Sequence, residues 1–215
     1  SASLIRDLIN SRHQAEALTA VRKLMPAVSW EILKEEIEKG RFVKKNSRLK
    51  ILNKTVDQLR RYNSKDLKKY KGIKNGLENR IIEKAASAFK TDSFLDSLKS
   101  KNLTESRIKR KLLQIYFDLD AEKINKVEKN APYYLRVLGV KKGKEYLLSR
   151  LQKKSEAEIV INPAAKINRI DLNARDPLSL SLSYDLLASD LYALLYQNSV
   201  HSIARRDFYQ KLIKV

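Results

Sequence analysis

The sequence predicts a mainly α protein, a bundle of short helices with a small βαβ unit of two short parallel strands in its C-terminal third. Three observations support this prediction. Apolar residues recur at helical spacing through residues 1–130, and runs typical of strands appear only after Pro132. The 215 residues include only five glycines and four prolines, so most of the chain is free to adopt regular structure.

The first forty residues predict three helices. Residues 4–9 and 15–24 each carry an apolar stripe, and the second run ends before Pro26. The third run has Ser29 where an N-cap is expected and Gly40 where the helix is expected to stop. Its predicted buried face consists of Ile32, Leu33 and Ile37.

Five more helical runs follow. The first of them, over residues 47–62, has an apolar stripe on one face. Its other face is basic and consists of Arg48, Lys50, Lys54, Arg60 and Arg61. The remaining runs cover residues 64–70, 75–89, 91–100 and 104–119. In three of these a Ser or Thr precedes the apolar positions, as an N-cap does.

The sequence changes character near Pro132. Residues 133–140 are rich in aromatic and β-branched residues and predict a strand, and residues 157–162 predict another. Between them, residues 141–154 predict an amphipathic helix with Tyr146, Leu147 and Leu151 facing inward. A strand, a helix and a strand within about thirty residues form a βαβ unit, in which the strands pair in parallel.

The last third of the chain completes the predicted organisation. Residues 184–197 predict an apolar, core-facing helix, and residues 205–215 predict either a last helix or a docked extension. We therefore expect a basic helical domain over residues 13–131. We expect residues 132–215 to form the βαβ unit with C-terminal helices packed on the helical domain.

Charge is the strongest functional observation. The formal net charge is +20, and residues 1–155 hold 38 basic and 18 acidic side chains, whereas residues 156–215 hold seven of each. A field of this size attracts polyanions, and a phosphate backbone is the commonest intracellular polyanion. The alternatives are a merely soluble surface, which needs far less charge, and an anionic membrane surface, for which no strongly amphipathic basic helix with an aromatic face stands out.

The usual constellations of enzymes are missing from the sequence. Cysteine is absent, and the two histidines, His13 and His201, lie far apart without spaced carboxylates, so neither a metal site nor a Ser-His-Asp set is indicated. The scattered glycines supply no phosphate-binding loop. No apolar run approaches the roughly 18–20 residues of a membrane span, and no signal peptide is visible, which favours a cytoplasmic location.

Four segments are more particular than the rest: "GLENRIIEKA" from Gly76, "TESRIKRKLLQIYFDL" from Thr104, "YYLRVLGVKKGKEYLL" from Tyr133 and "ASDLYALLY" from Ala188. In that order they resemble the C-terminal half of the bacterial tRNA(Met) cytidine acetate ligase family, formerly grouped as predicted nucleotidyltransferases. The resemblance covers most of the chain, is strongest from Gly76 to Leu148 and weakens after Pro163. Four ordered motifs are far more specific than one.

The resemblance implies an enzyme. A nucleotide-binding domain preceding this region would bind ATP, with Mg²⁺, and activate acetate as acetyl-adenylate. The acetyl group would then pass to the wobble cytidine of elongator tRNA(Met) and form N4-acetylcytidine. The resemblance places no catalytic residue, metal ligand or cofactor within this chain, so we expect the chain alone to be inactive.

The opening residues fit the same resemblance. In this family a Ser-Ala-Thr-x-Ile-Arg-like segment closes the nucleotide-binding domain, and "SASLIR" at residues 1–6 matches it with Ser3 in place of threonine. We therefore expect residues 1–12 to be the tail end of a missing N-terminal nucleotide-binding domain plus a junction helix. The family's nucleotide-site positions carry over to Ser1, Ser3 and Arg6. Arg6 has two open roles, contact with a phosphate at a helix N-terminus or support of the domain junction.

The remainder of the chain is expected to hold tRNA. Three basic clusters are the candidates for RNA contact, and for each the alternative is a solvated face. They are Arg48, Lys50, Lys54, Arg60 and Arg61; Arg107, Lys109, Arg110 and Lys111; and Lys141, Lys142 and Lys144.

Some motif residues are expected to be structural, and two other functions stay open. The structural candidates are Gly76, Glu78, Asn79, Arg80 and Arg136. An arginine inside a strand, such as Arg136, needs an anionic or carbonyl partner. The alternative functions are a stand-alone, non-catalytic RNA-binding module and an interaction domain whose basic face meets an acidic protein.

Overall fold

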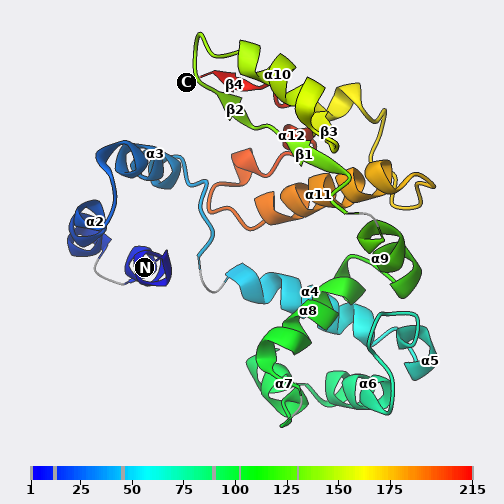
Figure 1. Cartoon of the computed structure of the whole chain (residues 1–215). Helices are drawn as coiled ribbons and strands as arrows, with labels where there is room; N and C mark the ends of the chain where they lie inside the picture. The colour runs from blue at the N-terminus through cyan, green and yellow to red at the C-terminus, as the bar shows by residue number, and fades with distance from the viewer. Residues whose placement is uncertain are drawn as a thin grey trace. The chain divides into compact units, whose positions relative to one another are not determined.

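The computed structural model describes residues 2–11, 14–44, 47–88, 91–101, 103–129 and 131–214. Helices dominate these residues, and the few short strands pair in parallel, which confirms the predicted mainly α class (Figure 1). The chain divides into two compact units. Unit 1 comprises residues 1–50 and 190–204, and unit 2 comprises residues 51–189 and 205–215. The predicted boundaries at residues 12 and 131 do not coincide with this division and stay a prediction.

Unit 1 consists of short helices and a returning segment of the chain. Gly40 ends the third helix with a φ of +68°, as predicted, and its carbonyl accepts hydrogen bonds from the backbone N–H groups of Gln197 and Asn198 at 3.0 and 3.1 Å. A β-carbon at Gly40 would lie 2.8 Å from that of Asn198, so glycine is required there. The elements are α1 (Ala2–Ile9), α2 (Gln14–Lys23), α3 (Ala27–Glu38) and the 3-10 turn η3 (Ser199–His201).

The predicted face of α3 is partly wrong. The helix begins at Ala27 after Pro26, so Ser29 lies inside it rather than at the N-cap. Trp30 is buried, whereas Ile32 is 58% exposed. Ile32 lies two residues from Trp30, roughly 200° around the helix, so the two side chains point to opposite sides. Trp30 therefore sets the buried row, and Ile32 falls outside it.

The helical part of unit 2 surrounds one apolar core. Leu59 from α4, Leu67 from α5, Phe94 from α7 and Ile115 from α8 are at most 1% exposed and belong to a single cluster. Burying a side chain of this size contributes about 1.5–3 kcal/mol, so these short helices owe their stability to packing. The elements are α4 (Arg48–Leu59), α5 (Ser64–Leu67), α6 (Leu77–Ser87), α7 (Thr91–Leu98), α8 (Glu105–Tyr116) and α9 (Ala121–Glu128).

The predicted βαβ unit is confirmed. Strand β1 (Tyr134–Arg136) pairs in parallel with β3 (Glu158–Val160), and α10 (Tyr146–Lys154) lies in the crossover between them. A second parallel pair joins β2 (Gly139–Val140) to β4 (Ile213–Lys214) beside the C-terminus (Figure 1). The end of the chain therefore supplies both of the predicted possibilities, because the short helix α12 (Arg206–Tyr209) precedes the docked strand.

A second apolar cluster supports this sheet. It joins Val160 of β3 to Leu182 and Leu186 of α11 (Pro177–Ala193) and to Phe208 of α12. The turn η2 (Pro163–Ala165) connects β3 to the loop that precedes α11. The expected core-facing helix over residues 184–197 is therefore present as part of α11, which begins seven residues earlier at Pro177.

Candidate nucleic-acid interface

The best-formed basic surface lies on α10 and the turn before it. Gly143, with a φ of +76°, turns the chain from β2 toward α10, and the backbone N–H of Lys144 donates to the carbonyl of Lys141 at 2.9 Å. The predicted cations Lys141, Lys142 and Lys144 therefore lie in this turn and not within the helix, which begins at Tyr146. All three side chains are exposed.

The prediction that α10 buries Tyr146, Leu147 and Leu151 is wrong. These side chains are 57%, 44% and 39% exposed, and none of the residues of α10 is buried. The helix lies over β3, and Leu148 is its one half-buried residue. Because the strands beneath are only two or three residues long, they offer the helix little apolar surface to cover.

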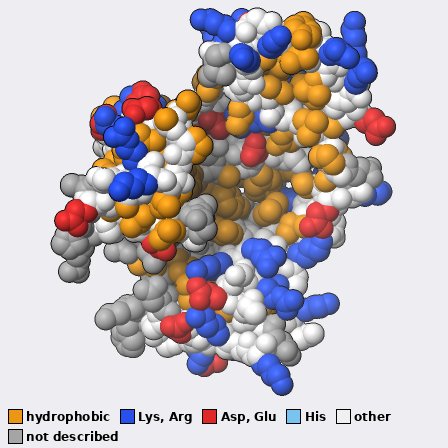
Figure 2. Space-filling view, turned by 60° about the vertical axis from the view of Figure 1, so that its left-hand side comes forward, with side chains coloured by type: hydrophobic (Ala, Val, Ile, Leu, Met, Phe, Trp, Pro, Cys, Tyr) orange, Lys and Arg blue, Asp and Glu red, His pale blue; other side chains and the backbone are white. Residues whose placement is uncertain are grey.

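The exposed face of α10 adds three cations to the turn. They are Arg150, Lys153 and Lys154. Among the described residues, no acidic group forms an ion pair with these three side chains or with Lys141 and Lys142. The only acidic residue between positions 141 and 154 is Glu145, which pairs with Lys214 at 3.3 Å. Figure 2 shows Lys and Arg side chains around apolar ones in the upper part of the molecule, which carries α10 in Figure 1.

The predicted cluster on α4 and the turn after it contains engaged cations as well as cations that have no partner among the described residues. Arg60 donates from Nε to the carbonyl of Ala85 at 3.0 Å and from Nη2 to that of Ala88 at 2.7 Å, so it holds the end of α6. Arg61, two residues after the end of α4, pairs with Asp57 of that helix at 2.8 Å. The remaining members are Lys50 and Lys54, which are exposed, and Arg48, whose side chain lies outside the described residues.

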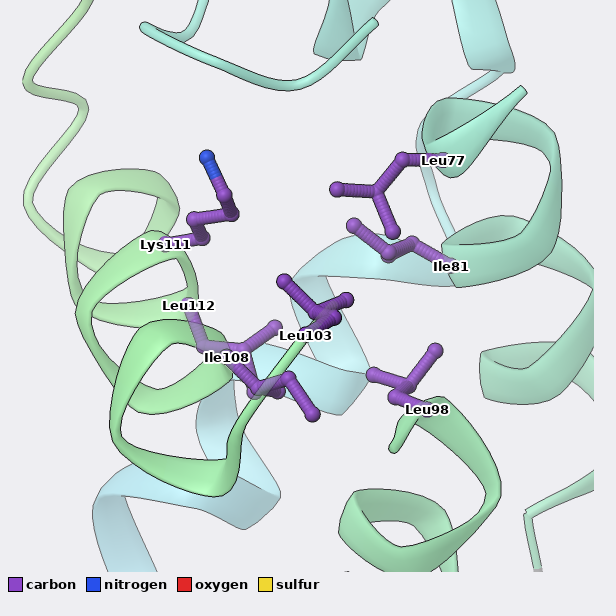
Figure 3. A pocket seen from close by; sticks show the side chains of 7 residues that line it. All are labelled: Leu77, Ile81, Leu98, Leu103, Ile108, Lys111 and Leu112. Carbon is purple, nitrogen blue, oxygen red and sulfur yellow. The ribbon is translucent and has the colours of Figure 1, made fainter. Parts of the chain in front are cut away.

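Lys111 of the predicted α8 cluster has a structural place. Its stem lines a shallow apolar hollow, too narrow for a water molecule, together with Leu77, Ile81 and Leu112 among others (Figure 3). Its amine donates to the carbonyl of Gly72 at 2.6 Å and that of Lys71 at 3.3 Å. Burial lowers the pKa of Lys111, and the charge of Arg107 adds to the effect.

The other cations of α8 are partly engaged as well. Lys109 contacts the carboxylate of Glu105 at 2.5 Å, and Lys99 approaches the same carboxylate at 2.8 Å. The Lys109 hydrogen bond, followed by that of Lys99, lowers the pKa of Glu105 to about 2. Arg110 donates to the carbonyl of Ser106 at 3.3 Å in its own helix. Arg107 is exposed and near enough to Lys111 to affect its titration.

The segment that begins at Gly76 is tied into the helical core. Gly76 is the N-cap of α6 with a φ of +86°. Glu78, in the first turn of α6, is buried, with Lys68 at 4.0 Å, and its Oε2 has no hydrogen-bond partner among the described residues. Arg80 donates to the carbonyls of Ser97 and Lys99 at 3.1 and 2.7 Å, which supports a structural role, and Asn79 is exposed.

Arg136 has the anionic partners that its place in a strand requires. Its Nη1 lies 3.3 Å from the carboxylates of both Asp185 in α11 and Asp207 in α12, and its Nη2 donates to the Asp207 carbonyl at 3.2 Å. Ser189 donates to the same Asp207 carboxylate at 2.8 Å. The arginine thereby joins β1 to two helices, which supports the structural role predicted for it.

The positions matched to the family's nucleotide site lie at the start of the chain. Ser3 and Arg6 are exposed on α1, and Ser1 lies outside the described residues. Arg6 occupies the last turn of α1, not its N-terminus, so the helix dipole there does not favour a phosphate beside it. The backbone carbonyl of Arg6 accepts a hydrogen bond from the Asn10 side chain at 2.7 Å.

The described residues contain no group of three or more His, Cys, Asp or Glu side chains placed to hold a metal ion. Within the same residues, no helix has the length and apolar character needed to cross a membrane.

Sequence reasoning missed the three cations on α10. Tyr146 was expected to face the core of the protein. It was therefore not grouped with Arg150, Lys153 and Lys154, which lie on the same face of the helix. The spacing of Tyr146, Arg150, Lys153 and Lys154 at i, i+4, i+7 and i+8 was the available indication.

The comparisons with known proteins agree along nearly the whole chain. A family model described as HIGH Nucleotidyl Transferase matches residues 1–207. A protein of Halothermothrix orenii named tRNA(Met) cytidine acetate ligase is 34% identical over 199 residues, which cover 93% of this chain and 47% of that protein. A protein of the same name from Thermotoga maritima is 30% identical over 216 residues, which cover 97% and 49% of the two chains.

Solved structures give the same result. The crystal structure of Thermotoga maritima TmcAL bound with alpha-thio ATP matches with a TM-score of 0.80 at 26% identity, over all of this chain and 52% of that one. The apo form of TmcAL matches with a TM-score of 0.82 at 29% identity, over all of this chain and 50% of that one. The chain therefore spans about half the length of the curated relatives it matches.

Proposed function

Because the chain belongs to the HIGH Nucleotidyl Transferase family, we propose that it is the tRNA-binding region of an ATP-dependent ligase. The ligase activates acetate as acetyl-adenylate and forms N4-acetylcytidine at the wobble position of elongator tRNA(Met). The observation that carries this proposal is the similarity, over nearly the whole chain, to proteins named tRNA(Met) cytidine acetate ligase. The ATP analogue bound to the Thermotoga relative supports the use of ATP.

The activation chemistry is assigned to the half of the relatives that this chain does not match. The resemblance carries only Ser1, Ser3 and Arg6 of the family's nucleotide site over to this chain, which supports placing the rest of an ATP–Mg²⁺ site in that half. We therefore assign no step of acetate activation to any residue of this chain. Its contribution is to hold the tRNA while the wobble base reaches the other half.

The cations that have no ion pair or hydrogen bond among the described residues make the contact with tRNA. Phosphate oxygens attract any exposed cation, but a lysine already bonded to a carboxylate or carbonyl must give up that bond to meet them. Among the residues predicted to contact RNA, the absence of such a bond favours Lys50, Lys54, Lys141 and Lys142. The three cations of α10, Arg150, Lys153 and Lys154, join them. The engaged members of the clusters on α4 and α8 contribute to the long-range field only.

The first test measures the affinity of the chain for elongator tRNA(Met) and for a second tRNA over a series of salt concentrations. We expect binding that weakens steeply with salt, because each phosphate contact releases counterions. A preference for tRNA(Met) would mean that these residues recognise that tRNA. Equal binding of the two tRNAs would mean that they contact the phosphate backbone without distinguishing one tRNA from another. Absence of binding at moderate salt would contradict the proposed role.

The second test concerns the ligase itself. The longer protein that contains this chain, supplied with ATP, acetate and tRNA(Met), is expected to produce N4-acetylcytidine, detected by mass spectrometry of the digested tRNA. The 215-residue chain alone is expected to produce none. If the longer protein bound tRNA(Met) but left it unacetylated, the ligase assignment would fall, and the alternative of a non-catalytic RNA-binding module would replace it.

A further inference from the structure

The outward face of α10 has an unusual composition. Helical spacing places Tyr146, Arg150, Lys153 and Lys154 on one side of the helix, because positions i, i+4, i+7 and i+8 fall within about a third of its circumference. Leu148, the half-buried residue, points to the opposite side, toward the strands. An exposed tyrosine and three cations therefore form one continuous surface.

The environment of Tyr146 suits a ligand with both a flat face and a negative charge. More than half of the side chain is exposed, and the amine of Lys144 lies 5.8 Å from the centre of its ring. An RNA base stacks on such a ring, and the phosphates on either side of the base reach neighbouring cations. Tyr192, another exposed tyrosine, lacks this setting, because it packs edge-on against Tyr196 and has Asp190 two residues away.

We propose that this face binds single-stranded RNA by stacking an unpaired base on Tyr146. We define it as the α10 platform, which consists of Lys141, Lys142, Lys144, Tyr146, Arg150, Lys153 and Lys154. The inference rests on the proposed tRNA-binding function and deepens it, because it assigns this surface to a loop or an end of the tRNA. Bases inside an RNA helix are already stacked on their neighbours and cannot reach a side chain in this way.

The charge of the α10 platform favours RNA over the other possible occupants. It has six cations, and Glu145, the one carboxylate in the segment, is neutralised by Lys214. An anionic lipid surface would instead be met by the leucines that α10 leaves half exposed, Leu147 and Leu151. Those leucines lie beside the outward face and not within the row of cations.

The test uses the 215-residue chain and a fluorescent single-stranded RNA of about 12 nucleotides, free or annealed to its complement. Anisotropy titration gives the dissociation constants at one salt concentration. We expect Tyr146→Ala to weaken binding of the single strand about 5- to 100-fold, the effect of losing one base stack, and to change duplex binding less than about twofold. Tyr146→Phe and Tyr146→Trp keep the stacking ring and are expected to stay within about threefold of the parent chain.

Tyr192→Ala is the matched control, because it removes another exposed tyrosine outside the α10 platform, and it is expected to leave single-strand binding unchanged. The proposal is overturned if Tyr146→Ala binds the single strand as the parent chain does, or weakens single strand and duplex equally. It is also overturned if vesicles of phosphatidylserine and phosphatidylcholine compete for the chain better than RNA.

The outcomes separate this inference from the proposed function. If the chain binds tRNA(Met) tightly but Tyr146→Ala leaves its affinity for single-stranded RNA unchanged, the proposed function stands and the stacking site is overturned. A chain that binds neither tRNA(Met) nor the single strand loses both.

Discussion

Each lysine or arginine on α8 and on α10 carries one positive charge, but the two helices differ in whether these side chains are bonded to other residues. Lys109 and Lys111 on α8 are bonded to a carboxylate and to backbone carbonyls of other residues. Lys153 and Lys154 on α10 are exposed and have no ion pair among the described residues. A cluster of cations in a sequence is therefore not yet a binding surface, because some of its members form ion pairs or hydrogen bonds within the fold. Removing an engaged cation should cost stability, and removing a free one should cost RNA affinity.

Arg136 is the engaged cation with the largest expected effect. Its side chain is 14% exposed and meets two carboxylates and a carbonyl. We expect Arg136→Ala to lower the free energy of unfolding by about 2–3 kcal/mol, less than for a fully buried pair because Asp185 is half exposed. Urea denaturation followed by circular dichroism measures this change. Lys153→Ala is the control and should stay within about 0.5 kcal/mol of the parent chain; equal losses in both variants would contradict the distinction.

Lys111 should show a smaller effect of the same kind. Lys111→Met keeps the stem that lines the apolar hollow but loses the amine that bonds to the carbonyls of Lys71 and Gly72. We expect the free energy of unfolding to fall by about 1–2 kcal/mol, with tRNA affinity changed less than about twofold. Arg110→Met, at an exposed position on the same helix, is the control for both measurements. A large loss of tRNA affinity without a loss of stability would show that Lys111 belongs to the free cations.

The smallest expected effect is a change in the pKa of Glu105, which shows whether Lys109 is bonded to its carboxylate. Its pKa of about 2, against an ordinary value of 4.5, is expected to appear as the titration midpoint of its side-chain carboxyl in carbon NMR. Because the folded-state pKa is lowered, the stabilisation by this carboxylate is present above pH 4.5 and is lost as the pH falls toward 2. Lys109→Met should raise the pKa, and Lys154→Met should leave it unchanged. A midpoint near 4.5 in the parent chain would mean that Lys109 is free.

More of the fold than of the candidate site could be predicted from the sequence. Periodicity and strand propensity were enough for the mainly α class, the parallel βαβ unit and the end of α3 at Gly40, because these depend on local sequence. Burial of individual faces was less predictable. Ile32 and Tyr146 were expected inside, but which row of a helix is buried depends on what packs against it, and that depends on residues distant in sequence.

The partners of the cations were the least predictable feature. Arg60 bonds to carbonyls 25 and 28 residues away, and Lys111 bonds to one 39 residues away, so nothing in their own helices reveals these contacts. Arg136 was the exception, because an arginine inside a strand already implies a partner. The sequence therefore predicted which segments are basic, but not which of their side chains bond to other residues of the fold.

The most direct test compares two triple variants that lose equal charge. Arg150, Lys153 and Lys154 become Gln in the first, and the exposed, ion-paired Arg61, Lys99 and Lys109 become Gln in the second. For tRNA(Met) we expect the first to bind about 30- to 100-fold more weakly at low salt, with a salt dependence reduced by about two counterions, and the second to stay within about threefold of the parent chain. Equal losses in the two variants would contradict the distinction between free and engaged cations, because binding would then follow net charge alone.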